Sequence, residues 1–414
     1  MHVLLAPIGT LGDVHPFVGL GSTLRKRGHR VTLVADGFFG PLADRAELGF
    51  VETASKQEYL DWLENPGRLT PSVASQLWWQ RMLRLMPAVH SAISDHYVPG
   101  ETVVIAPSWA LGARIANDQF KVPLAIVHLQ PFALQSICDR PQWPKWLPRG
   151  GLRLFNQYIR DVIAKQVGPQ LNAFRAELGL PAVVYPDRSW SHSPQTVIGL
   201  FPDWFSAPQR DWPSEVRLVG FPGYDAAPTT DDTDEVDEFL SDGEPPIVFS
   251  QGSSIVHADS YFATSAEVAR RLERRAILLT PFSRQIPQTL PPGVRHFKYM
   301  PFSRLLPRTA AHVHPGGIGT IAQTLAAGVP QMIVPTVNDQ PDNSLRLQRL
   351  GVSVHVQPSA YRPGRAVRQL RRLIESNETA RQCRTYAEIC RNTNAFESAC
   401  PVLEQLNEQD ELAN

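Results

Sequence analysis

The chain has 414 residues, a length that predicts two to three domains at roughly 150 residues each. Lysine plus arginine equals aspartate plus glutamate at 40 each, and this balance argues against nucleic acid as a partner, which needs clustered positive charge. Hydrophobic residues make up 43% and charged residues 19%, a composition that excludes a disordered chain.

The cysteines and the N-terminal residues bear on the cellular compartment. Cys138, Cys383, Cys390 and Cys400 form no C-x-x-C pair, which argues against a disulfide framework and a zinc site. The first residues lack a basic stretch, and their apolar run stops at Pro7, so we expect no signal peptide. No apolar stretch approaches the length of a transmembrane helix. We therefore expect a soluble, cytoplasmic protein.

The first half of the chain reads as an α/β sheet. Residues 2–6 predict a strand, 7–13 a glycine-rich loop, 16–27 an amphipathic helix and 31–35 a second strand. This order implies parallel strands joined by a crossover. Further short apolar runs, each followed by turn residues, occur at 103–106, 124–128 and 196–200.

Residues 72–86 between these runs predict an amphipathic helix that carries Trp78 and Trp79. A peripheral contact with a membrane surface is one interpretation. Packing on its own domain, or lining a cleft for a substrate, is the interpretation that we favour.

Residues 222–246 interrupt the α/β rhythm with prolines, glycines and a short acidic run, as a linker does. After it the rhythm restarts, with strands predicted at 246–250, 276–280, 311–314 and 331–335, and helices at 260–273, 319–327 and 344–350. We predict an N-terminal domain, a linker, a C-terminal domain and a last helical segment that crosses back to the first domain; their bounds are 1–221, 222–246, 247–385 and 386–414.

A second glycine-rich loop follows a predicted strand and opens a predicted helix. Its residues are His314, Pro315, Gly316, Gly317, Ile318, Gly319 and Thr320. Glycines allow the backbone to approach an anion, and a helix N-terminus directs free N–H groups towards it, so the loop suits a diphosphate. We expect His314 to add a side-chain donor at the mouth of this site. Asp339, Gln340 and Asn343 follow at the start of the next helix, where they can bind vicinal hydroxyls of a sugar.

Residues 314–343 resemble the donor-binding signature of inverting nucleotide-sugar glycosyltransferases of family one, His-x-Gly-Gly-x-Gly-Thr, then Gly-x-Pro, then Asp-Gln and a nearby Asn. The resemblance implies the GT-B fold, in which two Rossmann-like α/β domains face a central cleft. Residues 9–16, Gly-Thr-Leu-Gly-Asp-Val-His-Pro, are similar to the family's acceptor-side loop. Within the family, the chain resembles the catalytic subunit of bacterial rhamnolipid rhamnosyltransferase, in segments 108–116, 192–195, 200–202, 211–213, 220–222 and 251–253.

The resemblance implies a hexosyltransferase that needs a base for the acceptor hydroxyl and positive groups for the leaving diphosphate. Asp13 is the candidate base, and His15 is its rival. The alternative role of Asp13 is to cap the helix that follows it.

The resemblance also implies that Ser253 contacts the diphosphate with the glycine-rich loop. An aromatic residue for stacking on the base falls at Tyr299, beside Met300. The glutamate with which the family grips the ribose is replaced at Ala322 or Gln323. Loss of that carboxylate favours dTDP over UDP, because deoxyribose lacks the 2′-hydroxyl.

We predict a metal-independent transfer from a nucleotide sugar, dTDP-rhamnose being favoured, to a lipophilic hydroxylated acceptor such as a hydroxy fatty acid. The Asp232-Thr233-Asp234 run lies in the linker and is not taken as a metal site. A UDP-glucose-dependent transferase of sterols, phenols or polyketides is the alternative, and a non-catalytic nucleotide-sugar-binding protein is a distant one. The acceptor pocket is predicted from aromatic residues that could equally be core: Trp78, Trp79, Trp109, Phe132, Trp143 and Trp146.

Overall fold

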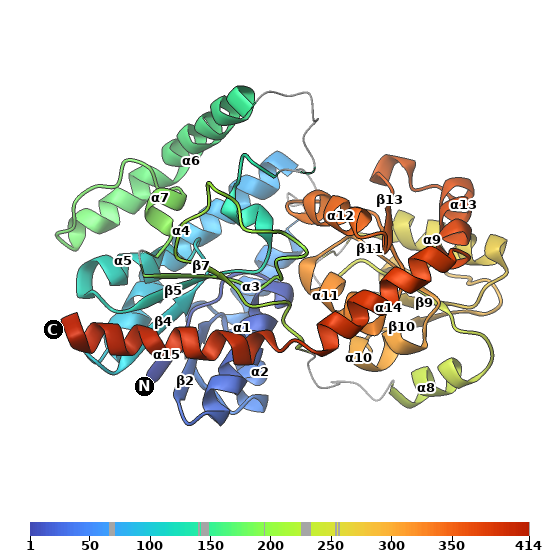
Figure 1. The fold of residues 1–414 in the computed structure, drawn as a ribbon, viewed down its shortest axis with the longest axis horizontal. Coiled ribbons are helices and arrows are strands. Elements are labelled where there is room, and N and C mark those ends of the chain that lie inside the picture. The colour runs from blue at the N-terminus through green and yellow to red at the C-terminus, as the bar shows by residue number, and fades with distance from the viewer. Residues whose placement is uncertain are drawn as a thin grey trace.

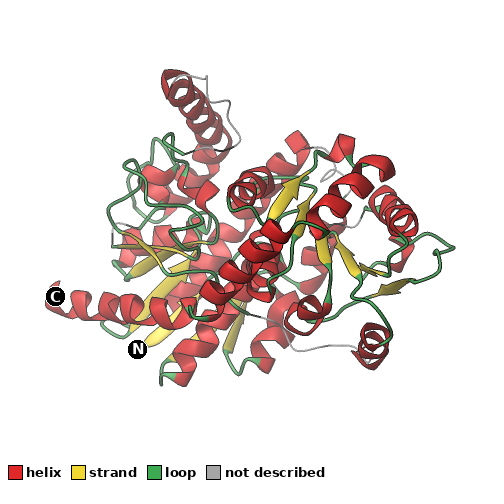
Figure 2. Cartoon of the chain, turned by 45° about the vertical axis from the view of Figure 1, so that its right-hand side comes forward, coloured by secondary structure: helices red, strands yellow, loops and turns green. Residues whose placement is uncertain are grey.

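A computed structural model describes residues 1–65, 71–139, 141, 149–193, 195–224, 233–252, 255 and 257–413. It contains two parallel sheets, each covered by helices (Figures 1 and 2). The first has the order β3-β2-β1-β4-β5-β6-β7 and the second the order β10-β9-β8-β11-β12-β13. Two Rossmann-like α/β domains of this kind confirm the predicted fold class.

The strands of the first sheet are β1 (His2–Leu5), β2 (Arg30–Ala35), β3 (Gly49–Glu52), β4 (Thr102–Ala106), β5 (Leu124–His128), β6 (Thr196–Gly199) and β7 (Val216–Leu218). Those of the second sheet are β8 (Ile247–Ser250), β9 (Ala276–Leu279), β10 (Val294–Phe297), β11 (Ala311–His314), β12 (Gln331–Ile333) and β13 (Ser353–His355). Their central members are buried along their whole length, as strands covered on both faces must be.

The helices of the first domain are α1 (Leu11–Lys26), α2 (Gly40–Arg45), α3 (Lys56–Glu64), α4 (Pro71–His96), α5 (Leu111–Phe120), α6 (Arg149–Glu177) and α7 (Arg188–Ser191). The second half contains α8 (Thr233–Ser241), α9 (Asp259–Leu272), α10 (Phe302–Leu305), α11 (Ile318–Ala327), α12 (Gln340–Arg349), α13 (Pro363–Ile374), α14 (Asn377–Arg391) and α15 (Ala395–Ala413). Within the described residues, none of these helices is long and apolar enough to cross a membrane.

Helix α1 begins at Leu11, five residues before the start that Pro16 suggested. Thr10 and Asp13 form a capping box that starts the helix early, and Pro16 lies inside it. The correction matters for the site, because it moves Asp13 from a loop into the first turn of the helix.

Four edge strands, β3, β7, β10 and β13, were not among the predicted strands. Each is three or four residues long, and β10 reads Val-Arg-His-Phe, with Arg295 exposed. A strand with so few apolar residues gives no clear period-two signal.

The segment predicted as a linker contains helix α8. Its residues Val236, Phe239 and Leu240 pack on strands β8 and β9 of the second sheet. Residues 225–232, which include most of the acidic run, lie outside the described part of the chain. The predicted domain boundaries stay predictions.

The last two helices connect the domains a second time. Helix α14 packs on α11 of the second domain, and α15 packs on α1 and on strands β4 and β5 of the first (Figure 1). Phe396 lies over Gly19 of α1, where a Cβ atom would come within 2.5 Å of the ring. The buried side chains of α15, among them Leu403 and Leu406, belong to the core of the first sheet.

Candidate active site

The glycine-rich loop between β11 and α11 presents free backbone N–H groups. Helix α11 starts after Gly317, which has no side chain to cap it, and the first intrahelical bond in this turn is from the Ile321 N–H to the Gly317 carbonyl. A Cβ atom on Gly317 or Gly319 would meet open space. Gly316 has φ +96°, and a Cβ there would lie 2.7 Å from Ile333. The loop therefore has the shape and dipole of an anion site.

His314 is placed differently from the expected donor at the mouth of this site. It is fully buried. Its Nδ1 accepts a hydrogen bond from the Gly316 N–H (3.2 Å), so its Nε2 carries the proton and donates to Gln331 Oε1 (2.9 Å). Burial lowers the pKa of His314 to about 4. The side chain is neutral and has both nitrogens engaged, so it fixes the loop and offers no free donor.

The predicted sugar-binding residues meet this loop from the start of α12. Asn343 donates to the Gly316 carbonyl (3.1 Å) and to Asp339 Oδ2 (2.6 Å). The Asn343 Oδ1 is buried with no hydrogen-bond partner among the described residues. Gln340 Oε1 accepts from the N–H groups of Thr336 and Val337 (2.8 and 3.0 Å), which leaves its NH₂ group for other contacts. The structure thus brings these three residues and the glycine-rich loop together.

Asp13 caps α1, as the alternative to catalysis required. Its Oδ2 accepts from the Thr10 N–H (2.8 Å) and the Thr10 hydroxyl (3.1 Å). Within the described chain, the hydrogen bonds of the Asp13 carboxylate go to Oδ2, so capping leaves Oδ1 available. Burial raises the pKa of Asp13, although the bonds from Thr10 oppose that rise. A carboxylate with a raised pKa is a stronger base than a solvated one.

Asp13 and Asp339 come from different domains, and the charge of Asp13 affects the pKa of Asp339. Burial raises the pKa of Asp339 to about 7, and the charges of Asp13 and Asp342 add to the rise. The rival base His15 lies edge-on to Tyr224, with ring centroids 5.5 Å apart, and burial lowers its pKa to about 4. The charge of the acceptor-side carboxyl group of Asp13 therefore acts on the donor-side carboxyl group of Asp339.

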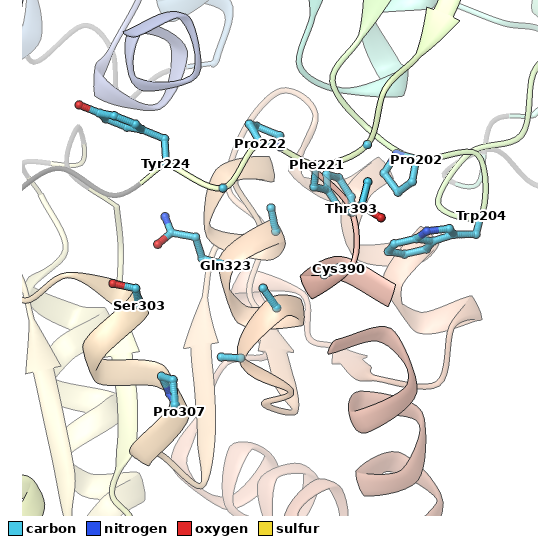
Figure 3. Close-up of a pocket in the computed structure, with 15 residues that line it drawn as sticks. Pro202, Trp204, Phe221, Pro222, Tyr224, Ser303, Pro307, Gln323, Cys390 and Thr393 are labelled. Carbon is cyan, nitrogen blue, oxygen red and sulfur yellow. The ribbon is translucent and has the colours of Figure 1, made fainter. Parts of the chain in front are cut away.

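The predicted nucleoside residues separate in the structure. Gln323 points into a cavity of about 300 Å³, between Tyr224 and Ser303 (Figure 3), and its Oε1 is buried with no partner in the described part of the chain. Tyr299 is half-buried and is not among the residues that line this cavity. Met300 is a correction: its side chain is 1% exposed and packs in the core of the second sheet. Ser253 lies outside the described residues.

The cavity is lined by the second domain on one side and by connecting segments on the other. Helices α10, α11 and α14 supply one side, and the loops around Pro202 and 220–224 supply the other. Sequence reasoning missed Tyr224, which lines this cavity and contacts His15, because a single aromatic residue in a linker carries no pattern.

Two of the predicted acceptor aromatics belong to one row of rings. The ring centroid of Trp78 lies 6.0 Å from that of Trp109 and 6.0 Å from that of Trp62. The ring centroid of Trp62 in turn lies 6.1 Å from that of Tyr59. Trp109 Nε1 donates to the carbonyl of Ile8 (3.0 Å), in the loop between β1 and α1. The sequence analysis missed Trp62 and Tyr59, since their helix gave no further signal of a site.

The remaining predicted aromatics lie apart from this row or outside the described chain. Trp79 packs on the cluster between α4 and α6, and Phe132 is 38% exposed in the turn after β5. Trp143 and Trp146 fall outside the described residues. Among the described residues, no three His, Cys, Asp or Glu side chains gather as a metal site. Transfer without a metal stays a prediction.

Comparison with known proteins identifies both halves of the chain. Residues 3–132 match the glycosyltransferase family 28 N-terminal domain, and residues 267–400 match the erythromycin biosynthesis protein CIII-like C-terminal domain. The O-mycaminosyltylonolide 6-deoxyallosyltransferase of Streptomyces fradiae is 29% identical over 98% of this chain and 97% of its own length. A sterol 3-beta-glucosyltransferase of Arabidopsis thaliana is 27% identical over 85% of this chain, which spans 57% of that protein.

Solved structures share the fold. The glycotransferase of kitacinnamycin has a TM-score of 0.73 at 19% identity and covers 98% of both chains. The spinosyn rhamnosyltransferase complexed with thymidine diphosphate has a TM-score of 0.68 at 15% identity, over 98% of this chain and all of the other. From the two domain matches and these relatives, the chain is a family-one glycosyltransferase of the GT-B type, a hexosyltransferase that acts on nucleotide sugars.

Proposed function

We propose that the chain transfers a 6-deoxyhexose from a dTDP-sugar, dTDP-rhamnose being favoured, to a hydroxyl of a lipophilic acceptor such as a hydroxy fatty acid. The observations that carry the proposal are the effect of the Asp13 charge, on the acceptor side, on Asp339, on the donor side, and the link from Asp339 through Asn343 to the glycine-rich loop. A base and a sugar site at one place are what a one-step displacement needs.

In the proposed reaction, Asp13 Oδ1 accepts the proton of the acceptor hydroxyl. The hydroxyl oxygen forms its bond to the anomeric carbon from the face opposite the diphosphate, with inversion. The bond from that carbon to the phosphate oxygen breaks, and the nucleoside diphosphate leaves with the electron pair. The free N–H groups at the start of α11 stabilise the negative charge that develops on it.

The sugar contacts follow from the same residues. Asp339, with a pKa of about 7, can donate or accept a hydrogen bond near neutral pH. The partnerless Oδ1 of Asn343 can accept from a sugar hydroxyl, and the NH₂ group of Gln340 can donate to one. We assign these three residues to the sugar.

The preference for dTDP is supported by the second turn of α11. Ala322 and Gln323 face the cavity without a carboxylate to bind a ribose 2′-hydroxyl. Relatives agree: one transfers 6-deoxyallose, and the spinosyn rhamnosyltransferase was crystallised with thymidine diphosphate. The resemblance to rhamnolipid rhamnosyltransferase supports the hydroxy fatty acid.

The second candidate is transfer of glucose from UDP-glucose to a sterol, phenol or polyketide. The sterol 3-beta-glucosyltransferase from Arabidopsis supports it. The row of Trp62, Trp78 and Trp109 beside the Asp13 loop suits a flat, rigid acceptor as well as an acyl chain.

The experiment measures binding of dTDP and UDP by calorimetry, then product formation by mass spectrometry for dTDP-rhamnose and UDP-glucose with hydroxy fatty acid and sterol acceptors. Tighter dTDP binding with rhamnosylated fatty acid supports the proposal. Tighter UDP binding with a glucosylated sterol overturns it in favour of the second candidate.

The base is tested with Asp13→Asn, whose amide oxygen can still accept from Thr10 and cap α1. We expect kcat to fall by about 10²- to 10⁴-fold, because proton transfer is lost, with nucleotide affinity unchanged. His15→Gln is the matched variant for the rival base. Wild-type turnover in Asp13→Asn together with loss in His15→Gln would reverse the assignment.

A further inference from the structure

The guanidinium group of Arg346 lies between the two domains. Arg346 belongs to α12 of the second domain and is 4% exposed. Its Nη1 donates to Asp139 Oδ2 (2.6 Å) and to the Ser206 hydroxyl (2.9 Å), and its Nη2 donates to the Asp139 carbonyl (3.3 Å). Three acceptors from the first domain thus converge on one side chain of the second.

The charges around this contact balance only when the domains are together. Arg346 Nε donates to Asp342 Oδ2 (2.7 Å) within its own helix, and Arg349 Nη1 donates to Asp139 Oδ1 (2.9 Å) across the interface. Two cations therefore face two carboxylates. Despite burial, Arg346 and Arg349 hold the pKa of Asp139 below its usual range. Separation of the domains would break the bonds of both arginines to Asp139 at once, so the contact is either made or lost.

The donor side of this contact adjoins the proposed sugar site, and the acceptor side is held within the first domain. On the donor side, Arg346 lies one turn after Asn343 on α12, whose first residues form the proposed sugar site. On the acceptor side, Asp139 ends the segment that follows β5 and Phe132. That segment is fixed from within the first domain, because Asp211 accepts from the Ser136 hydroxyl and the Ile137 N–H (both 2.7 Å).

The contact is distinct from the covalent connections between the domains. At those connections the chain itself passes across, and Trp204 of the first domain packs on Tyr386 of α14, with ring centroids 4.8 Å apart. In Figure 1, α12 lies near the top of the second domain, whereas α14 runs diagonally across that domain and α15 continues along the first domain. The Arg346 contact can therefore open while the α14–α15 crossing stays in place as the hinge.

We propose that Arg346 is a positioning residue for glycosyl transfer: it joins the acceptor-side segment 136–139 to the sugar-side helix α12 and so sets the distance between the acceptor hydroxyl and the anomeric carbon. The inference rests on the proposed sugar site at Asp339, Gln340 and Asn343. Arg346 itself need touch neither substrate, since it acts through the two segments that it joins.

The test compares Arg346→Gln, Asp139→Asn and the double variant with the wild type. We expect kcat to fall by about 10- to 100-fold in each single variant, in line with coupling energies of close charge pairs. The double variant should lose no more than either single one, because both break one contact. Nucleotide affinity should stay within about twofold, because the diphosphate loop lies wholly within the second domain.

A readout that needs no turnover is small-angle X-ray scattering with bound dTDP or UDP. The wild type should be compact, and Arg346→Gln and Asp139→Asn should have a larger radius of gyration. This measurement decides the inference even if the sugar or acceptor of the proposed function is wrong, since it does not depend on either. A wild type inactive with all four substrates would overturn the proposed function alone.

Arg308→Gln is the matched control. Arg308 donates to the Asp237 carboxylate (2.7 Å), the Asp237 carbonyl (3.3 Å) and the Ser241 hydroxyl (2.9 Å). These are the kinds of acceptor that Arg346 has across the interface, but all of them lie within the second domain. It should keep wild-type kcat and radius of gyration. The inference is overturned if Arg346→Gln keeps both as well, or if the losses in the two single variants multiply. Should Arg346→Gln fail to fold, Asp139→Asn and Ser206→Ala carry the same test from the first domain.

Discussion

At the scale of the residue, Asp339 makes the free energy of unfolding depend on pH. Burial, with the carboxyl groups of Asp13 and Asp342 nearby, raises its pKa from 3.8 to about 7. The folded protein therefore keeps a proton on Asp339 that the unfolded chain releases from about pH 4 upwards. Asp339 therefore lowers the free energy of unfolding progressively as the pH rises from about 4 towards 7. The full decrease is reached once the pH lies above the pKa of Asp339 in the folded protein.

Asp339→Asn should remove that cost. The variant should be more stable than the wild type at pH 8, by at most about 4 kcal/mol, and the difference should shrink towards pH 5. Urea denaturation at the two pH values measures it, with the exposed carboxyl variant Asp242→Asn as the control. A difference that is the same at pH 5 and pH 8 would show that Asp339 does not hold a proton in the folded state.

Single residues also mark the limit of what the sequence could tell. The motif around His314 predicts a diphosphate loop with a free histidine donor, yet the His314 side chain is buried against Gln331, because a donor and a structural hydrogen bond look the same in a pattern. Met300 followed from its place beside Tyr299, but its side chain packs in the core of the second sheet. Arg346 had no signal at all, since its partners Asp139 and Ser206 are distant in sequence.

At the scale of the element, two glycines at the start of α11 have different roles: Gly316 serves the fold, and we propose that Gly319 serves diphosphate binding. Gly316 must be glycine for the backbone, because its φ is +96° and Ile333 fills the space of a Cβ. Gly319 has open space where its Cβ would lie, so a methyl group there would point into the proposed diphosphate site.

We expect Gly316→Ala to lower the free energy of unfolding by about 1–3 kcal/mol and to impair nucleotide binding with it. Gly319→Ala should leave stability unchanged or raise it, since alanine favours a helix, and should still weaken dTDP or UDP binding by at least about tenfold. Urea denaturation and titration calorimetry measure the two effects. Wild-type nucleotide affinity in Gly319→Ala would remove α11 from the diphosphate site.

Elements were predictable where their pattern was strong. The apolar runs at 103–106 and 124–128 coincide with β4 and β5, which are buried on both faces. The start of α1 was placed too late, because Pro16 is also a good first helical residue and only the bonds between Thr10 and Asp13 decide between the two starts. The short edge strands carry too few apolar residues to be recognised.

At the scale of the whole molecule, the fold class was predictable, whereas the contacts between domains were not. Periodicity indicated two α/β halves, and the family resemblance supplied their arrangement. The electrostatic effect of Asp13 on Asp339 depends on the relative orientation of the two domains, which local sequence patterns do not encode.

The second crossing of the chain gives the whole-molecule prediction. Leu403 of α15 is completely buried in the core of the first sheet. Leu403→Ala should lower the free energy of unfolding by about 2–5 kcal/mol, whereas Gln405→Ala, an exposed neighbour, should change it little. Denaturation followed by tryptophan fluorescence reports on the first domain, which contains all nine tryptophans. Equal stability of the two variants would mean that α15 does not complete that core.

Helix α15 also imposes an order on biosynthesis. All seven strands of the first sheet have left the ribosome once Leu218 has emerged, but the helix that covers β4 and β5 is encoded at the far end of the chain. The first domain must therefore wait with apolar surface uncovered while the second is synthesised, and the second, made of one continuous stretch, can fold ahead of it. The step that closes the first domain thus comes after synthesis of the second domain.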